Sequence, residues 1–273
     1  MEHYADYLSL CAAAAAGGAV NSIAGGGTLL TFPALFAALG ASEDSANAAV
    51  VANATSTVAL FPGSLASMAG YRREMAEVPR WALLLIVPSL LGGYFGSRLV
   101  TTLPAETFEA LVPWLILTAA LLFWLQPKIG KWIGIGAEHA PATRRTVAAA
   151  IGFQLLVAIY GGYFGAGIGI LMLGALAMMG LGDIHRMNAL KTLLGSCING
   201  VAVAVFIAGG KVNWPIAIVM AVAAMVGGYF GAHLARRLDR NLVRRMVVGI
   251  GFSLAAYYFW SSAMLSSAAS RVG

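Results

Sequence analysis

Long runs of apolar residues, separated by short polar stretches, cover almost the whole chain. The runs occupy residues 7–39, 45–69, 81–102, 108–126, 146–180, 188–208, 214–235 and 242–262. A helix needs roughly 20 apolar residues to cross a bilayer, and most of the runs have about that length. The pattern therefore predicts an all-α polytopic membrane protein.

Two of the runs are too long for one straight crossing, and each contains glycines near its middle. Residues 7–39 number 33 and residues 146–180 number 35. The first run contains Ala24-Gly25-Gly26-Gly27-Thr28, and the second contains Gly165-Ala166-Gly167-Ile168-Gly169. Glycine in a helix interior costs about 1 kcal/mol relative to alanine, so we expect each run to break there into two helical pieces.

The chain also repeats itself. Gly92-Gly93-Tyr94-Phe95-Gly96 recurs 135 positions later as Gly227-Gly228-Tyr229-Phe230-Gly231, and Asn47-Ala48 recurs 141 positions later as Asn188-Ala189. The repeated glycines favour close packing of one helix in each half. We expect an N-terminal membrane repeat at 1–127, a cytoplasmic linker at 128–143 and a C-terminal membrane repeat at 144–273.

The composition excludes several classes of protein. Sixty per cent of the residues are hydrophobic, only 10% are charged, and the mean hydropathy is +0.81, which excludes a soluble enzyme, a disordered segment and a secreted disulfide scaffold. Both cysteines lie inside apolar runs, and no Cys/His cluster has metal-ligand spacing, so we expect no metal site and no cofactor. The net charge of +6 is scattered over short loops, which favours a membrane topology signal over a nucleic-acid partner.

The distribution of Lys and Arg distinguishes two topologies. Eight simple crossings would put nine of these residues on one side and eight on the other, although cytoplasmic loops normally carry the excess. If each long run forms a hairpin, fourteen fall on one side, and only Arg98, Lys211 and Arg271 on the other. We therefore expect two inverted repeats of five segments, with both termini outside. The pattern leaves open whether the hairpins cross or re-enter, which gives eight to ten membrane segments.

The breaks are candidate anion sites. A helix N-terminus exposes unpaired N–H groups and carries roughly half a positive charge, and two helical pieces would begin near Thr28 and Gly169. The alternative is that the glycines serve only helix packing, and that nearby hydroxyl and amide groups bond only between helices. The substrate-binding candidates are Asn21, Ser22, Gly25, Gly26, Gly27, Thr28, Asn53, Thr55, Ser56, Tyr163, Gly167, Gly169 and Ser196. Lys191 is either an interfacial lysine or a counter-charge for the substrate.

Catalytic chemistry is not indicated. The sequence has no nucleophile–base pair, no phosphate-binding loop and no carboxylate in the middle of an apolar run, so we expect no catalytic residues and no enzyme activity.

Several motifs resemble one transporter family. The segment from Val20 to Leu35, with the run Ala52-Asn53-Ala54-Thr55-Ser56 and Gly70-Tyr71-Arg72-Arg73, is similar to the signature of the TauE/SafE sulfite exporter family, also called the toluene-sulfonate uptake permeases. The resemblance covers both halves of the chain. It implies a permease that moves small anions, often sulfite, sulfoacetate or other sulfonates, across a bacterial inner membrane.

These features predict a secondary transporter that works by alternating access in a lipid bilayer. The sequence leaves open the identity of the small anionic substrate, the direction of transport, a coupling proton or sodium ion, and a homodimer. Two other functions stay open: a passive channel for small solutes, and a membrane subunit of a partner enzyme that does not itself transport.

Overall fold

The computed structural model describes residues 2–24, 26–40, 45–132, 143–181, 183–234 and 240–272. Over these residues the fold consists of eleven α-helices and one 3₁₀ helix, without a β-strand. The helices are α1 (Glu2–Ala24), α2 (Thr28–Leu39), α3 (Ser45–Gly70), α4 (Arg72–Ala76), η1 (Arg80–Leu85), α5 (Ile86–Thr102), α6 (Ala105–Trp132), α7 (Arg144–Tyr163), α8 (Ile168–Met178), α9 (Ile184–Ala208), α10 (Trp214–Leu234) and α11 (Arg240–Val272).

The expected polytopic membrane protein is confirmed. Five helical segments of the described chain are long and apolar enough to cross a bilayer: Ala46–Gly70, Arg80–Thr102, Ala105–Ile129, Arg144–Tyr163 and Ile184–Ala208. Shorter apolar helices add Tyr7–Asn21, Thr28–Leu39, Ile168–Ala177 and Trp214–Phe230. The helix α6 continues to Trp132, and residues 133–142 of the expected linker lie outside the described residues.

Both expected helix breaks are present. Helix α1 ends at Ala24 and α2 begins at Thr28, while α7 ends at Tyr163 and α8 begins at Ile168. The second pieces have 12 and 11 residues. At 1.5 Å per residue each extends less than about 20 Å, which is shorter than the roughly 30 Å hydrocarbon core, so neither piece crosses the membrane alone.

The two breaks use glycine for different reasons. Gly165 and Gly167 have φ of 84° and 80°, a left-handed conformation that L side chains rarely adopt. Gly27 instead has a right-handed backbone, with φ −56°. A Cβ at Gly27 would collide with the backbone carbonyl of Gly17 in α1, so the first break needs glycine for close approach of the chain.

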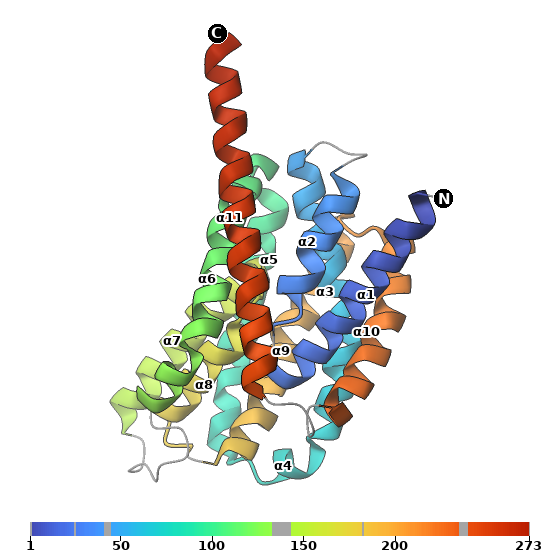
Figure 1. The fold of residues 1–273 in the computed structure, drawn as a ribbon. Helices are drawn as coiled ribbons and strands as arrows, with labels where there is room; N and C mark the ends of the chain where they lie inside the picture. The colour runs from blue at the N-terminus through green and yellow to red at the C-terminus, as the bar shows by residue number, and fades with distance from the viewer. Residues whose placement is uncertain are drawn as a thin grey trace.

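Helices from the two halves of the chain pack against each other throughout the bundle. Helix α1 packs against α10 and α5 against α7, while α3 packs against α9 and α6 against α11. Figure 1 shows the start of α1 and the end of α11 at one end of the bundle, with α4 at the other. We call the end at which α4 lies the α4 end, and the end at which α1 starts and α11 ends the opposite end.

The repeated glycines pack closely, as the sequence predicts. A Cβ at Gly96 would collide with the carbonyl oxygen of Ile159 in α7, and one at Gly227 would collide with that of Ala15 in α1. Both contacts are backbone to backbone. The glycine copies therefore set the separation of α5 from α7 and of α10 from α1.

Candidate functional site

A central cavity lies between the two helix breaks and the long helices α3 and α9. It leaves about 60 Å³ for the centres of water-sized molecules. One water needs roughly 10–15 Å³ on this measure, so the cavity holds only a few groups of that size. Its walls are formed by Asn21, Thr28, Thr57, Leu60, Ser64, Ser67, Phe164, Gly165, Ile168, Gly169, Met172, Lys191, Thr192, Gly195, Ser196 and Asn199.

The N-terminal ends of two helices border this cavity. Thr28 is the first residue of α2, and Gly169 is the second residue of α8. The amides of Leu29 and Leu30 donate to Gly26 and Gly27, at 3.1 and 3.0 Å. Within the described chain, the amides of Thr28 and Gly169 have no backbone acceptor. The cavity therefore lies where both helices present free donors and the positive ends of their dipoles.

Polar side chains from α3 and α9 line two sides of the cavity. On α3, Thr57, Ser64 and Ser67 each donate to a carbonyl four residues earlier in the helix, and the Nδ2 atom of Asn21 in α1 donates to the Ser64 hydroxyl at 3.1 Å. On α9, the hydroxyl of Ser196 is buried, with 6% of the residue exposed, and has no hydrogen-bond partner among the described residues. An unpaired buried polar group costs about 1–3 kcal/mol, so Ser196 has a donor available for a bound molecule.

The described part of the cavity wall carries one positive charge and no negative one. Among the lining residues that the structure describes, Lys191 is basic and none is acidic. Its Nζ atom donates to the Oδ1 atom of Asn188 at 3.0 Å. A lysine held about two helical turns into α9 adds to the positive ends of α2 and α8.

Some predicted site residues lie elsewhere, in direct contacts between helices. The Nδ2 atom of Asn53 donates to the carbonyl of Tyr163 at 3.0 Å, and the backbone amide of Asn213 donates to the Thr55 hydroxyl at 3.0 Å. The Ser56 and Thr31 hydroxyls bond to each other. These residues connect α3 to the rest of the bundle and do not line the cavity.

Two of the remaining predicted residues pack closely against α6, and two others lie outside the part of the chain that the structure describes. Gly26 is buried, and a Cβ there would collide with the ring of Phe123 in α6. Gly167 faces Leu122, with its ideal Cβ position 3.3 Å from Cδ1. Gly25 and the side chain of Ser22 lie outside the described residues. Of the thirteen candidates, the structure brings Asn21, Thr28, Gly169 and Ser196 together at the cavity.

Sequence reasoning did not select several residues of the cavity wall. Thr57, Leu60, Ser64 and Ser67 are spaced by three, four and three positions, which places them on one face of α3. On α9, Thr192 and Asn199 lie four residues before and three residues after the predicted Ser196, which is also a helical spacing. The helical period of polar positions is therefore the signal that could have found them.

A layer of aromatic rings separates the cavity from the opposite end of the bundle. The Phe164 ring lines the cavity and packs edge to face against Phe32, with ring centroids 5.3 Å apart. Phe108 contacts Phe32 at 6.3 Å and Tyr163 at 5.3 Å. All four residues are buried. Toward the α4 end, by contrast, the cavity wall extends to Ser67, close to the end of α3.

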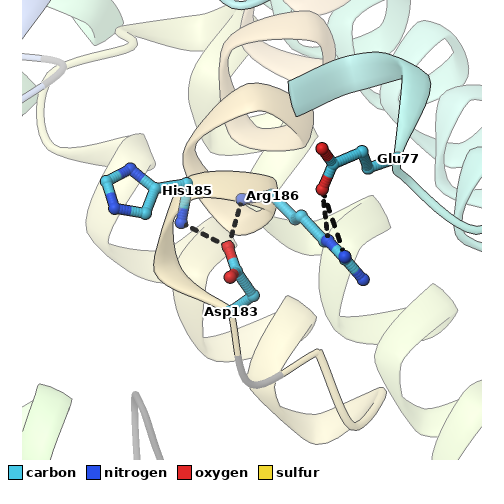
Figure 2. Close-up of polar contacts among 4 residues, drawn as sticks. All are labelled: Glu77, Asp183, His185 and Arg186. Atoms are coloured by element: carbon cyan, nitrogen blue, oxygen red, sulfur yellow. Dashed lines mark hydrogen bonds and ion pairs between the residues drawn. The ribbon is translucent and has the colours of Figure 1, made fainter. Parts of the chain in front are cut away.

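Charged residues join the two halves of the chain at the α4 end. Figure 2 shows Arg186 of α9 donating from Nε and Nη2 to the Oε2 atom of Glu77, at 3.2 and 3.1 Å. Asp183 caps α9 by accepting from the amides of His185 and Arg186 at 2.8 and 2.9 Å. The hydrogen bond from the Arg186 amide lowers the pKa of Asp183 below its ordinary value. The cap fixes the start of the helix that carries Lys191 and Ser196.

Comparisons with known proteins identify the kind of protein. A family model described as "Sulfite exporter TauE/SafE" matches residues 10–258. The "Probable membrane transporter protein YfcA" of Escherichia coli K12 is 29% identical over 245 residues, which are 90% of this chain and 86% of the relative.

Other relatives give the same result. A "Probable membrane transporter protein" of Haemophilus influenzae is 26% identical over 242 residues, with 87% of this chain and 88% of the relative covered. The "Probable membrane transporter protein ORF9" of a Sinorhizobium species is 27% identical over 252 residues, covering 90% and 89%. No solved structure matches the chain significantly.

Proposed function

The chain belongs to the sulfite exporter TauE/SafE family of membrane transporters, which are not enzymes, and on this basis we propose that it binds and moves a small sulfur oxyanion. Sulfite or a short sulfonate such as sulfoacetate is the proposed substrate, and the central cavity is its binding site. The observation that carries the proposal is the meeting of two helix N-termini and Lys191 at one cavity whose described wall has no acidic residue.

The charges around the cavity support an anion over a cation or a neutral solute. A helix N-terminus stabilises a negative charge by about 0.3–1 kcal/mol at an exposed site and by up to about 2 kcal/mol in a partly buried one. Helices α2 and α8 both contribute, and Lys191 adds a full positive charge. The hydroxyl of Ser196, which has no partner in the part of the chain that the structure describes, would donate to an oxygen of the anion.

The size of the cavity supports a small ligand. A space of about 60 Å³ for the centres of water-sized molecules matches an oxyanion of the size of sulfite or sulfate. A long-chain or aromatic sulfonate would need the aromatic layer at Phe164 to move.

The helix pairings support an inverted-repeat transporter. Helices α1 to α6 form one repeat and α7 to α11 the other, so that α1 corresponds to α7 and α5 to α10. The pair α1 with α10 is then the counterpart of the pair α7 with α5, as two-fold related repeats require. The hairpin topology predicted from the sequence assigns fourteen Lys and Arg residues to one side of the bilayer, including Arg72 and Arg73 of α4, and three to the other side. We therefore place the α4 end in the cytoplasm of a bacterial cell and both termini in the periplasm.

The closed aromatic layer supports alternating access. Phe32, Phe108, Tyr163 and Phe164 block the cavity on the periplasmic side, while its wall reaches toward the cytoplasmic end. The structure is then the inward-facing member of a cycle in which α2 and α8 move against α3 and α9 and part these rings.

Transport by the purified protein tests the proposal. Flux of labelled sulfite, sulfoacetate and acetate into proteoliposomes is measured with and without proton and sodium gradients. We expect saturable flux of a sulfur anion and little flux of acetate. Flux that neither saturates nor responds to any gradient would identify a passive channel, and the absence of flux for every anion would favour a subunit of a partner enzyme.

A further inference from the structure

A second hollow lies on the outer surface of the bundle, between α5 and α9. Its volume is about 660 Å³, much larger than the central cavity. Its walls are formed by Leu90, Tyr94, Arg98, Thr101, Ser196, Cys197, Gly200, Val201, Ala204, Val205, Ala208 and Gly209. Leu90 and Tyr94 are 39% and 46% exposed, so the groove opens toward the surroundings of the protein, which for these helices is the lipid.

The groove has the length of one leaflet of a bilayer. Helices α5 and α9 both run from the α4 end to the opposite end, and at that end the ideal Cβ position of Gly209 lies 3.4 Å from Cγ2 of Thr101. From Leu90 to Thr101 the α5 wall rises about 16 Å at 1.5 Å per residue. Half of the roughly 30 Å hydrocarbon core is about 15 Å. The groove therefore runs from the surface at the opposite end to the middle of the membrane.

Among the described residues that line the groove, Arg98 is the charged one, and it lies near the surface end. Arg98 is exposed, four residues before the end of α5, and within the described residues no ion pair joins it to an acidic side chain. Deeper in the groove the walls are mostly apolar, with Leu90, Val201 and Ala204 among them. A basic group at headgroup depth above an apolar channel matches a molecule with a negative head and a hydrocarbon tail.

We propose that this groove binds one anionic phospholipid from the leaflet at the opposite end of the bundle. An acyl chain lies between α5 and α9, and the phosphate meets the guanidinium group of Arg98. The inner end of the groove is bounded by Ser196, which also lines the central cavity. The lipid tail thus reaches the outer side of the wall that faces the cavity. This site does not depend on the proposed transport substrate.

Native mass spectrometry of the detergent-purified protein tests the lipid site. Phosphatidylglycerol and phosphatidylcholine with identical acyl chains are titrated separately. We expect one tightly retained phosphatidylglycerol and weaker retention of phosphatidylcholine. Arg98→Ala should weaken phosphatidylglycerol binding about fivefold, the effect of one basic residue near an anionic headgroup. Lys211→Ala, which removes a charge at the same end but outside the groove, should leave retention unchanged.

A second pair of variants tests the acyl-chain channel. Ala204 is exposed within the groove, so Ala204→Trp should fill the channel and abolish retention of the lipid. Ile207 is 42% exposed on the same helix but outside the groove, so Ile207→Trp is the matched control. Equal retention of both lipids, equal loss in Arg98→Ala and Lys211→Ala, or unchanged retention in Ala204→Trp would overturn the proposal. Displacement by glycerol phosphate, which has no acyl chain, would instead assign Arg98 to a soluble anion.

Discussion

The side-chain amide of Asn53 donates a hydrogen bond of 3.0 Å to the backbone carbonyl of Tyr163, which is 110 positions away in the sequence. Asn53 lies in α3, and Tyr163 is the last residue of α7 before the second helix break. Asn53 is 1% exposed, so the bond is shielded from water. It holds the end of α7, and with it the neighbouring Phe164 of the cavity wall, against a helix from the other half of the chain.

Replacement of Asn53 by leucine should destabilise the protein by about 1–3 kcal/mol, because the buried Tyr163 carbonyl then loses its donor. Thermal unfolding in detergent measures the effect. Thr102→Ala is the control, since the exposed Thr102 hydroxyl bonds only to a carbonyl of its own helix, and it should shift stability by less than about 0.5 kcal/mol. Equal unfolding temperatures for the two variants would contradict the anchoring role of Asn53.

Replacement of Lys191 by methionine should weaken binding of sulfite at least tenfold, because the described wall of the cavity then has no positive side chain. Charged hydrogen bonds are worth about 1.5–3 kcal/mol, and about 1.4 kcal/mol corresponds to a factor of ten. Calorimetry in detergent measures the affinity. Lys191→Arg keeps the charge and should retain most of the binding. Lys128→Met removes an exposed lysine that lies over the Trp124 ring, and a loss of affinity there would indicate a general effect of charge.

Replacement of Gly227 by alanine should destabilise the contact between α1 and α10, because the new Cβ would collide with the carbonyl of Ala15. Overpacking of this kind costs about 1–3 kcal/mol. Gly249 has no described neighbour within 4 Å of an ideal Cβ, so Gly249→Ala should leave the unfolding temperature unchanged or raise it slightly. If both variants unfold at the wild-type temperature, α1 and α10 are not packed through Gly227.

The cap at Asp183 predicts that the stability of the folded protein falls at acidic pH. Because the hydrogen bond from the Arg186 amide lowers the pKa of Asp183, the folded state favours the ionised carboxylate. The contribution of the ionised cap to the free energy of unfolding is complete above the ordinary aspartate pKa of about 3.9. It is lost as the pH falls through the lower pKa that Asp183 has in the folded protein. Asp183→Ala should unfold at a lower temperature at neutral pH and lose part of the acid dependence. Asp183→Asn keeps an acceptor for the cap and should resemble the wild type at neutral pH.

The features predicted correctly from the sequence are those that local chemistry determines. The apolar runs predicted a polytopic helical protein, the glycine clusters located the ends of α1 and α7, and the repeated glycines indicated helix contacts. Glycine is costly in a helix interior and permits backbone contact, so its clusters indicate breaks and crossings before any tertiary structure is known.

The composition of the cavity wall could not be predicted in the same way. Helices in a membrane bundle are apolar on nearly every side, so the spacing of a few polar positions is only a weak signal of which face turns inward. A cluster of polar residues favours a binding site in the sequence, as at Asn53, Thr55 and Ser56. In the structure, however, the side chains of these residues form hydrogen bonds with residues of other segments. Ser64, Ser67 and Thr192 line the cavity because of how α3 and α9 are rotated in the bundle. Only tertiary packing determines that rotation.

The position of the bound anion tests the central claim most directly. Selenite has the shape and charge of sulfite, and its selenium atom scatters anomalously, so diffraction from crystals grown with selenite locates the ion. We expect one anomalous peak in the central cavity, within hydrogen-bond reach of the Thr28 and Gly169 amides and the Ser196 hydroxyl. A peak only at surface arginines, or full selenite transport with no peak in the cavity, would contradict it.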